Sequence, residues 1–450
     1  MGKGAIAFLA VFALLVIFAI PNVWLGYVGY AAVSILCPQW NWRWELPGIE
    51  FQKWIAGATI IAFLVSGLRV QKLNAYSKFA LLGFSTYVFL VFLSSLQVPD
   101  EEKAIRYWDN TWKIWVMTMI GCFVVDTRKK LNLLVWACII AQGWNAWNVN
   151  QLYLQRGFIN VLWFTWNFLD NNTYSISTIP VLAISFSTVV CSVKSWERLV
   201  AGIVALLQIH QLMILQSRGT MLGAAALFVI GFFFMPKSKA TIAILGCIVG
   251  VGAMVAGPFV IEEFLSSFKQ GEELDSSANS RYKLWSAGAA IIMDYPFLGV
   301  GPWVGEKYVP TYYDGYSEGR AYKALHNLLF EVGTGCGLPA LIAYLVFFAF
   351  PWYGHLRLWM KDRLKMDVFS RRFNLAVLCG VPGYWVASMF SSGALIESPY
   401  VLMVIGCVSL SLIEEAFRED DTDDPVRFEV GSEREDIVCD SHAAKIAMEI

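Results

Sequence analysis

Asn279-Ser-Arg-Tyr-Lys-Leu-Trp285 and His326-Asn-Leu-Leu-Phe-Glu331 lie within residues 261–340, the longest polar interruption in an otherwise largely apolar chain. In the first segment, apolar positions recur at helical spacing, which predicts an amphipathic helix on a membrane surface. The second segment returns the chain to apolar sequence. An arginine, an aromatic helix and a histidine at a membrane boundary are typical of a reaction site rather than of a connector.

The composition indicates a membrane protein with many spans. Of the 450 residues, 57% are hydrophobic and only 15% are charged, whereas soluble domains carry about 25% charged residues. The 19 Trp and 18 Tyr residues fit the aromatic belts found at both membrane surfaces. The nine Cys residues mostly lie in apolar runs and show no zinc-binding spacing, so neither a disulfide framework nor a zinc site is expected.

The predicted fold is all-α and polytopic, with about 12 transmembrane helices of about 20 residues each. Residues 5–37 supply one or two of these helices, because Pro21 and Asn22 interrupt them; two helices there would give about 13 and an outward N-terminus. The remaining apolar runs fall near 51–68, 79–97, 109–125, 131–149, 176–193, 199–216, 219–235, 241–261, 328–350, 373–390 and 399–414.

Positive charge recurs in every second loop, which sets the expected orientation because cytoplasmic loops are enriched in Lys and Arg. The large loop at 262–325 then faces outward and contains short amphipathic helices, while the basic loop at 355–372 faces the cytoplasm. Residues 1–415 form the expected membrane domain. Residues 416–450 form an acidic tail, which we expect to be disordered and cytoplasmic. The Asp421-Thr-Asp423 pattern in this tail fits a solvated segment better than a metal–nucleotide site.

Arg218 lies between two apolar runs with almost no loop. An arginine at membrane depth costs at least about 2.5 kcal/mol to insert, so it usually lines a cavity or binds an anion. The alternative is an interfacial arginine whose head group reaches water. Its neighbours Ser217 and Gly219 would allow a tight turn and the close approach of a ligand.

His326 is the only one of the four histidines expected at an outer membrane boundary. An imidazole can accept a proton near neutral pH, although a packing role is the ordinary alternative. Asn327 and Glu331 follow it as polar neighbours. We also expect the glycines after it to thin the helix and admit a substrate; they are Gly333, Gly335 and Gly337.

Arg281, with Lys283 close by, adds positive charge to the outer loop. Two arginines can bind a diphosphate through paired N–H donors and stabilise it as a leaving group. His326 would then orient or deprotonate an attacking hydroxyl. Because no outward-facing acidic cluster has metal-binding spacing, the expected transfer uses no metal and no other cofactor.

The motifs at these residues resemble those of bacterial O-antigen ligases and the related polymerases. Arg218-Gly-Thr-Met-Leu222 is similar to their Arg-x-x-x-Leu element, and His326-Asn327 followed by Gly337 is similar to their His-Asn-x9-Gly-x-x-Gly element. Ala340 replaces the last glycine of that element. Other segments that resemble the superfamily are 280–302, Asp170-Asn-Asn172 and Cys37-Pro-Gln-Trp40, the last being closest to O-glycosylation ligases associated with the exosortase system.

The resemblance implies a GT-C-type glycosyltransferase in the bacterial inner membrane with its active site facing the periplasm. It would transfer a glycan from undecaprenyl diphosphate to a lipid A core sugar or to a protein Ser/Thr. The bilayer is the other expected partner, and no nucleic acid is expected. The implied catalytic residues are Arg218, Arg281 and His326, and the implied substrate-binding residues are Arg218, Arg281, Lys283, Asn327, Asn172 and Glu331.

Two alternatives stay open at this point. A polysaccharide polymerase of the same superfamily would differ only in its acceptor. A solute transporter would also have many spans and polar residues within them, but transporters usually show inverted repeats and charges at mid-membrane. This sequence shows no such repeat, and its candidate charges lie at one face.

Overall fold

The computed structural model describes residues 2–68, 70–161, 170–239, 241–243, 246, 250, 276–313 and 323–422, and no strand occurs among them. The helices are α1 (Lys3–Ala19), α2 (Val23–Leu36), α3 (Pro38–Asn41), α4 (Phe51–Val65), α5 (Ala75–Ser95), α6 (Glu102–Val124), α7 (Arg128–Arg156), α9 (Asn171–Cys191), α10 (Ser195–Ile214), α11 (Arg218–Phe234), α13 (Ser276–Asp294), α14 (Gly305–Tyr312), α15 (Leu328–Asp362), α16 (Val368–Ser388) and α17 (Glu397–Thr422).

These helices confirm an all-α polytopic membrane protein. Within the described residues, five helices are long and apolar enough to cross a membrane by length and composition: α5, α9, α10, α15 and the Glu397–Glu419 part of α17. Four apolar helices are shorter, namely α1, α2, α4 and α11. The expected number of about 12 spans therefore stays a prediction. The apolar run at 241–261 lies almost entirely outside the described residues.

Residues 5–37 form two helices rather than one. The backbone leaves the helix between α1 and α2, at the predicted interruption. The amide of Gly2 donates a hydrogen bond to Glu45 at 2.8 Å, and the Phe8 ring stacks on Trp42 with centroids 4.8 Å apart. Because the start of α1 contacts the loop that follows α2, the two helices run antiparallel.

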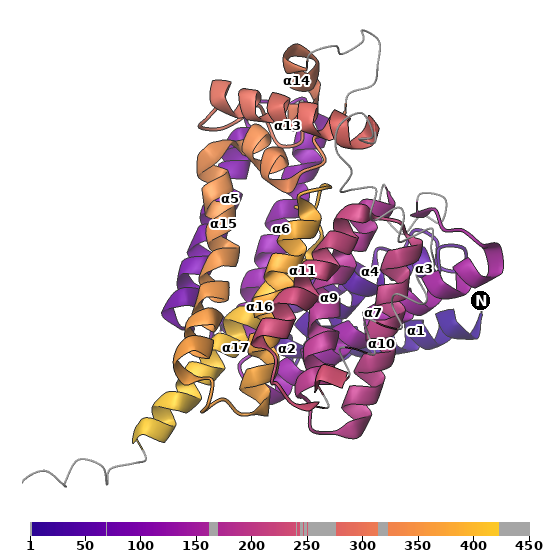
Figure 1. Cartoon of the computed structure of the whole chain (residues 1–450), viewed down its shortest axis with the longest axis vertical. Coiled ribbons are helices and arrows are strands. Elements are labelled where there is room, and N and C mark those ends of the chain that lie inside the picture. Colours follow the sequence, from indigo (N-terminus) through magenta and orange to yellow (C-terminus); the bar gives the residue numbers. More distant parts are fainter. Residues whose placement is uncertain are drawn as a thin grey trace, which may run out of the picture.

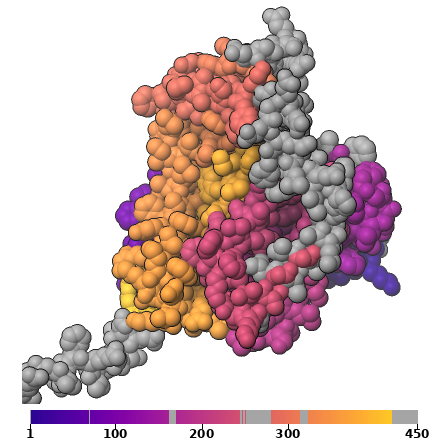
Figure 2. Space-filling view, in the orientation of Figure 1, coloured from indigo at the N-terminus to yellow at the C-terminus, as the bar shows by residue number. Residues whose placement is uncertain are grey.

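The bundle has two parts (Figure 1). On one side α5 packs along α15, with α13 lying across their upper end and α14 above it. Figure 2 shows the surfaces of α13 and α15 continuing into one another along this side. In the centre α16 packs between α9 and α11. A Cβ atom on Gly223 would lie 2.7 Å from the carbonyl oxygen of Gly383, so small residues allow close helix contact, as is common in membrane helices.

A kink divides α15 near its start. Gly337 has φ 82° and ψ 172°, a conformation that is essentially restricted to glycine. The segment 296–301 binds the backbone around this kink: Val300 N donates to Thr334 O at 2.9 Å, and Leu338 N donates to Pro296 O at 2.8 Å. The connection between α13 and α14 is thereby held against α15.

The glycines of α15 do not leave room for a substrate, so that expectation was wrong. A Cβ atom at Gly333 would lie 2.6 Å from Ile292 Cδ1, and one at Gly337 would lie 2.2 Å from Phe297 O. A Cβ atom at Gly335 would likewise lie 3.2 Å from Gly301 O. The missing side chains make room for residues 292–302 of the same chain.

The basic loops lie together at the end of the bundle opposite α13. Arg128 forms an ion pair with Asp367 at 2.5 Å, and Arg357 donates a hydrogen bond to the Tyr76 hydroxyl at 2.5 Å. The ring of Phe234 meets that of Trp359 at 5.0 Å. Four loops that the sequence assigns to one membrane side therefore share one end of the fold. The helix α17 continues to Thr422, and residues 423–450 lie outside the described residues.

Replacing Gly337 with Ala should destabilise the protein by at least about 1–3 kcal/mol, because alanine disfavours this backbone conformation and its methyl group would overlap Phe297. Gly57→Ala is the matched control, since no atom lies within 4 Å of the added Cβ in α4. The control should be neutral or stabilising by up to about 1 kcal/mol. Thermal unfolding of both variants in one detergent measures this difference. Equal melting temperatures would contradict the role given to the kink.

Candidate functional site

Three helices begin near one another at the end of the bundle that carries α13. They are α9, capped by Asp170; α11, which begins at Arg218; and α15, capped by Asn327. Thr173 lies in the first turn of α9, and Ser391 lies in the loop that joins α16 to α17. Their hydroxyl oxygens are 3.4 Å apart. Each helix N-terminus carries partial positive charge and unpaired backbone N–H groups. This arrangement favours an anionic ligand.

Arg218 is the first residue of α11 and is half-buried. The turn before it is tight, as expected, because Gln216 has a positive φ of 53°. Gly219 does not face open space: a Cβ atom there would lie 2.4 Å from Phe390 Cβ. The glycine therefore brings the start of α11 against the segment that follows α16.

Arg281 lies on α13 and is half-buried. One helical turn later, the Trp285 ring packs between two others, with centroid distances of 6.4 Å to Phe330 and 6.1 Å to Phe390. Phe390 is the same residue that contacts Gly219. These aromatic contacts join the face of α13 that carries Arg281 to the N-terminus of α11.

His326 directly precedes the cap of α15, has a positive φ of 48° and is half-buried. Burial lowers the pKa of its imidazole below the ordinary value of 6.5, the Asp170 carboxylate raises that pKa, and Arg281 and Lys323 lower it. The ring is consequently neutral at pH 7 and can accept a proton. Arg281 and Asp170 are therefore near enough to His326 for their charges to act on its ring.

Asn327 and Glu331 are buried beside His326 and have structural partners. Asn327 Oδ1 accepts hydrogen bonds from the backbone of Leu329 at 2.8 Å and Phe330 at 3.4 Å, which makes it the cap of α15. Glu331 Oε1 accepts a hydrogen bond from Trp303 Nε1 at 2.7 Å. Glu331 Oε2 and Trp285 Nε1 are buried and make no hydrogen bond of good geometry among the described residues, although the Ser392 side chain lies near the Glu331 carboxyl group. A bound ligand could satisfy both groups.

The other two predicted residues differ in position. Asn172 lies in the first turn of α9, half-buried, and its amide makes no hydrogen bond within the described part of the chain. It lies two residues after Asp170, the cap whose charge acts on His326, and its contact with a substrate stays a prediction. Lys283 is exposed, and its Nζ lies 5.8 Å from the centroid of the Tyr313 ring. It points away from the face of α13 that carries Arg281, so its contact with a substrate stays a prediction.

Two further features of the site were not identified from the sequence. Asp170 was noted only as part of a motif, although its charge acts on His326. The loop 389–396 forms one wall of the site. Two buried tyrosines fix it: Tyr384 donates a hydrogen bond to Gly393 O at 3.2 Å, and Tyr400 donates one to Ala394 O at 2.5 Å. A short loop between two apolar runs gives no signal in the sequence that it meets the first turn of α11 at Gly219.

The chemistry available at this site is anion binding combined with proton transfer. Arginines, helix N-termini and an indole N–H are all donors, and the neutral imidazole is a proton acceptor. No group of three or more His, Cys, Asp or Glu side chains in the described residues could hold a metal ion.

Comparison with known families divides the chain into two parts. Residues 203–345 match the family model described as O-Antigen ligase, and residues 4–185 match a model described as a family of unknown function. The first match contains Arg218, Arg281 and His326, and the second contains Asp170 and Asn172. No curated protein matches the chain.

The titration of His326 should follow from these charges. Asp170→Asn keeps an N-cap side chain, since Asn caps a helix as well as Asp does, but it removes the charge that raises the imidazole pKa. The His326 pKa should therefore fall in Asp170→Asn and rise in Arg281→Gln, with the wild-type value below 6.5 between them. The rate of His326 modification by diethylpyrocarbonate against pH, followed by mass spectrometry, reports the neutral fraction. Unchanged midpoints in both variants would disprove the electrostatic coupling.

Proposed function

We propose that this chain, which carries an O-antigen ligase domain at residues 203–345, transfers a glycan from undecaprenyl diphosphate to an acceptor hydroxyl. The observation that supports this proposal is the grouping of Arg281, His326 and Asp170 beside the helix start at Arg218. A diphosphate donor needs positive charge, and an attacking hydroxyl needs a proton acceptor.

Arg218 and Arg281 would hold the diphosphate. A guanidinium group offers a planar pair of N–H donors that matches two phosphate oxygens. The N-terminus of α11 adds its own partial positive charge directly at Arg218. As the sugar leaves, negative charge grows on the bridging oxygen, and these fixed donors stabilise it without reorganisation.

His326 would take the proton from the acceptor. In the proposed step the acceptor oxygen forms a bond to the anomeric carbon while the bond from that carbon to the diphosphate oxygen breaks. The hydroxyl proton moves to the neutral imidazole, and the electron pair leaves with undecaprenyl diphosphate. Asp170 then stabilises the imidazolium, because it favours the charged form of His326. The diphosphate is a good leaving group, so the proposed step needs no metal.

The remaining polar groups would bind the glycan. Trp285 offers a buried indole N–H that lacks a partner among the described residues. Glu331 Oε2 is a buried hydrogen-bond acceptor near the start of α15. Asn172 offers an amide at the start of α9. Lys283 would act at the approach to the site, because it lies on the exposed surface of α13.

The proposed orientation places this site in the periplasm of a bacterial inner membrane. It is supported by the position of the basic loops at the opposite end of the bundle, since positive charge is retained on the cytoplasmic side. The acceptor would be a lipid A core sugar or a protein Ser/Thr. A polymerase of the same superfamily would use a lipid-linked sugar instead, and a glycan-acceptor profile of a deletion strain distinguishes these cases.

Variants of the three central residues should separate donor binding from proton transfer. Arg218→Lys and Arg281→Lys keep the charge but lose the paired donors, so each should reduce kcat/KM by about 10- to 100-fold. His326→Ala should reduce kcat by about 10²–10⁴-fold while donor affinity changes little, and higher pH should partly restore it. The assay uses purified protein, lipid-linked donor and excess EDTA, with donor binding measured separately.

Arg106→Lys is the control for the arginine variants, because within the described residues Arg106 forms only an exposed ion pair with Glu102 in α6. It should change kcat/KM by less than about 3-fold. If His326→Ala transfers glycan at the wild-type rate, His326 is a packing residue and the proposed mechanism fails.

The orientation is tested by cysteine labelling with a membrane-impermeant reagent. Tyr282 on α13 is 62% exposed and Leu364 at the basic end is 87% exposed. In cells with a permeabilised outer membrane, Tyr282→Cys should be labelled and Leu364→Cys should not. The background should lack Cys37, Cys247 and Cys439, because the other cysteines are buried. The reverse labelling pattern would place the site in the cytoplasm.

A further inference from the structure

A cavity of about 560 Å³ lies at the basic end of the bundle, away from the candidate active site. Its walls come from the segment before α5, the first half of α5 and the last turns of α6. Tyr76 at the start of α5 accepts a hydrogen bond from Arg357, which places the cavity at the end that carries the basic loops. The volume falls within the range of small-molecule sites, about 300–1,000 Å³.

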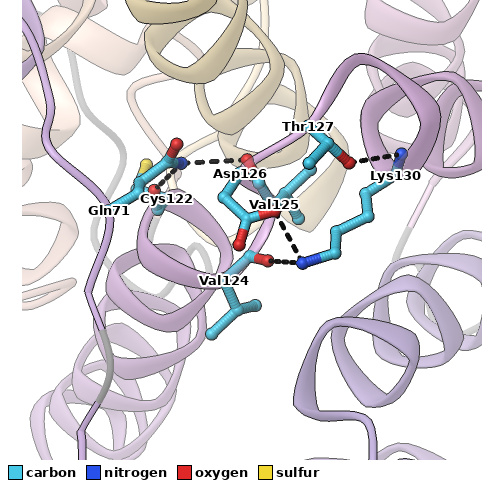
Figure 3. A network of polar contacts seen from close by, with 7 residues as sticks. All are labelled: Gln71, Cys122, Val124, Val125, Asp126, Thr127 and Lys130. Carbon is cyan, nitrogen blue, oxygen red and sulfur yellow. Dashed lines mark hydrogen bonds and ion pairs between the residues drawn. The ribbon is translucent and has the colours of Figure 1, made fainter.

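One wall of the cavity is fixed by Gln71 (Figure 3). Its side-chain amide donates hydrogen bonds to the carbonyls of Cys122 at 2.5 Å and Val125 at 2.9 Å, and its backbone N–H donates to Phe123 O at 3.2 Å. These bonds satisfy the end of α6 and hold residues 70–73 beside it. Hydrogen bonds therefore fix this wall in the folded protein.

Two lysines at the cavity have no acidic partner. Lys72 and Lys78 line it, are exposed, and form no ion pair within the residues that the structure describes. Nearby Lys130 is different, because its Nζ binds Asp126 at 2.6 Å and the Val124 carbonyl at 3.5 Å (Figure 3). Positive charge at Lys72 and Lys78 thus remains for a ligand.

The end of the cavity along α5 beyond Lys78 is apolar. Leu81, Leu82 and Met119 line it, and the apolar ring of Phe123 lies nearer to Gln71. The one hydroxyl there, on Ser85, is already satisfied, since it donates to Leu81 O at 2.8 Å and accepts from Trp115 Nε1 at 3.0 Å. A polar ligand would find no partner at this end, whereas a hydrocarbon chain would fit it.

From this division we infer that the cavity binds an anionic phospholipid, with its phosphate on Lys72 and Lys78 and an acyl chain along Leu82 and Phe123. The basic end of the bundle would meet the membrane leaflet that is rich in such lipids. This site is independent of the glycan-transfer site, which lies at the other end of the helices.

The test measures lipid binding to the full-length protein in detergent by native mass spectrometry, together with the shift in melting temperature. The ligands are phosphatidylglycerol, phosphatidylcholine and inorganic phosphate. Wild-type protein should bind phosphatidylglycerol most tightly. Lys72→Gln/Lys78→Gln should weaken that binding by about 30-fold, which is the effect of about 1 kcal/mol for each lysine. Lys72→Arg/Lys78→Arg should bind as the wild type does.

Lys129→Gln/Lys361→Gln is the matched control, because it removes two other exposed lysines that form no ion pair among the described residues. It should change binding by less than about 3-fold, and all variants should melt at similar temperatures without lipid. Equal weakening by the control pair would show only general attraction to positive charge and would overturn the site. Unchanged binding in the Lys72→Gln/Lys78→Gln variant, equal affinity for phosphatidylcholine, or equal stabilisation by inorganic phosphate would also overturn it.

Discussion

Backbone hydrogen bonds between residues 296–301 and the kinked start of α15 hold α13 in place above the bundle. The kink at Gly337 frees backbone groups, and Val300 and Leu338 complete pairs across it. Ser94 at the end of α5 also binds this region, because its hydroxyl oxygen lies 2.7 Å from both Leu298 O and Gly335 O. Buried backbone groups must be paired in a membrane protein. Arg281 lies on α13, so its position depends on these contacts between residues 296–301, α5 and α15.

The candidate site joins segments that are distant in sequence through close aromatic and helix-end contacts. Phe390 meets both Gly219 and Trp285, while His326 and Gln216 adopt backbone conformations that non-glycine residues rarely take. Such conformations cost about 1–3 kcal/mol and persist only where the surrounding structure imposes them. Their position beside the candidate site residues is consistent with a site whose geometry is set in advance.

The two ends of the bundle use positive charge differently. At the upper end, arginines stand beside helix N-termini and a histidine, where an anion can be bound and a proton moved. At the basic end, several cations are already paired, as with Arg128 and Asp367, while Lys72 and Lys78 form no ion pair with any residue that the structure describes. The length of the helices separates the two groups, so the proposed lipid site and the proposed glycan-transfer site do not overlap.

Composition, apolar runs and alternating basic loops were sufficient to determine the all-α membrane fold, because hydrocarbon requires helices whose backbone is internally bonded. Short motifs also pointed to Arg218, Arg281 and His326. Only the tertiary structure showed that Asn327 caps α15 and that Asp170 acts on His326. It also showed that residues 292–302, and not a substrate, pack against the glycines of α15. These facts depend on which side chains meet across helices, and spacing along one chain does not specify that.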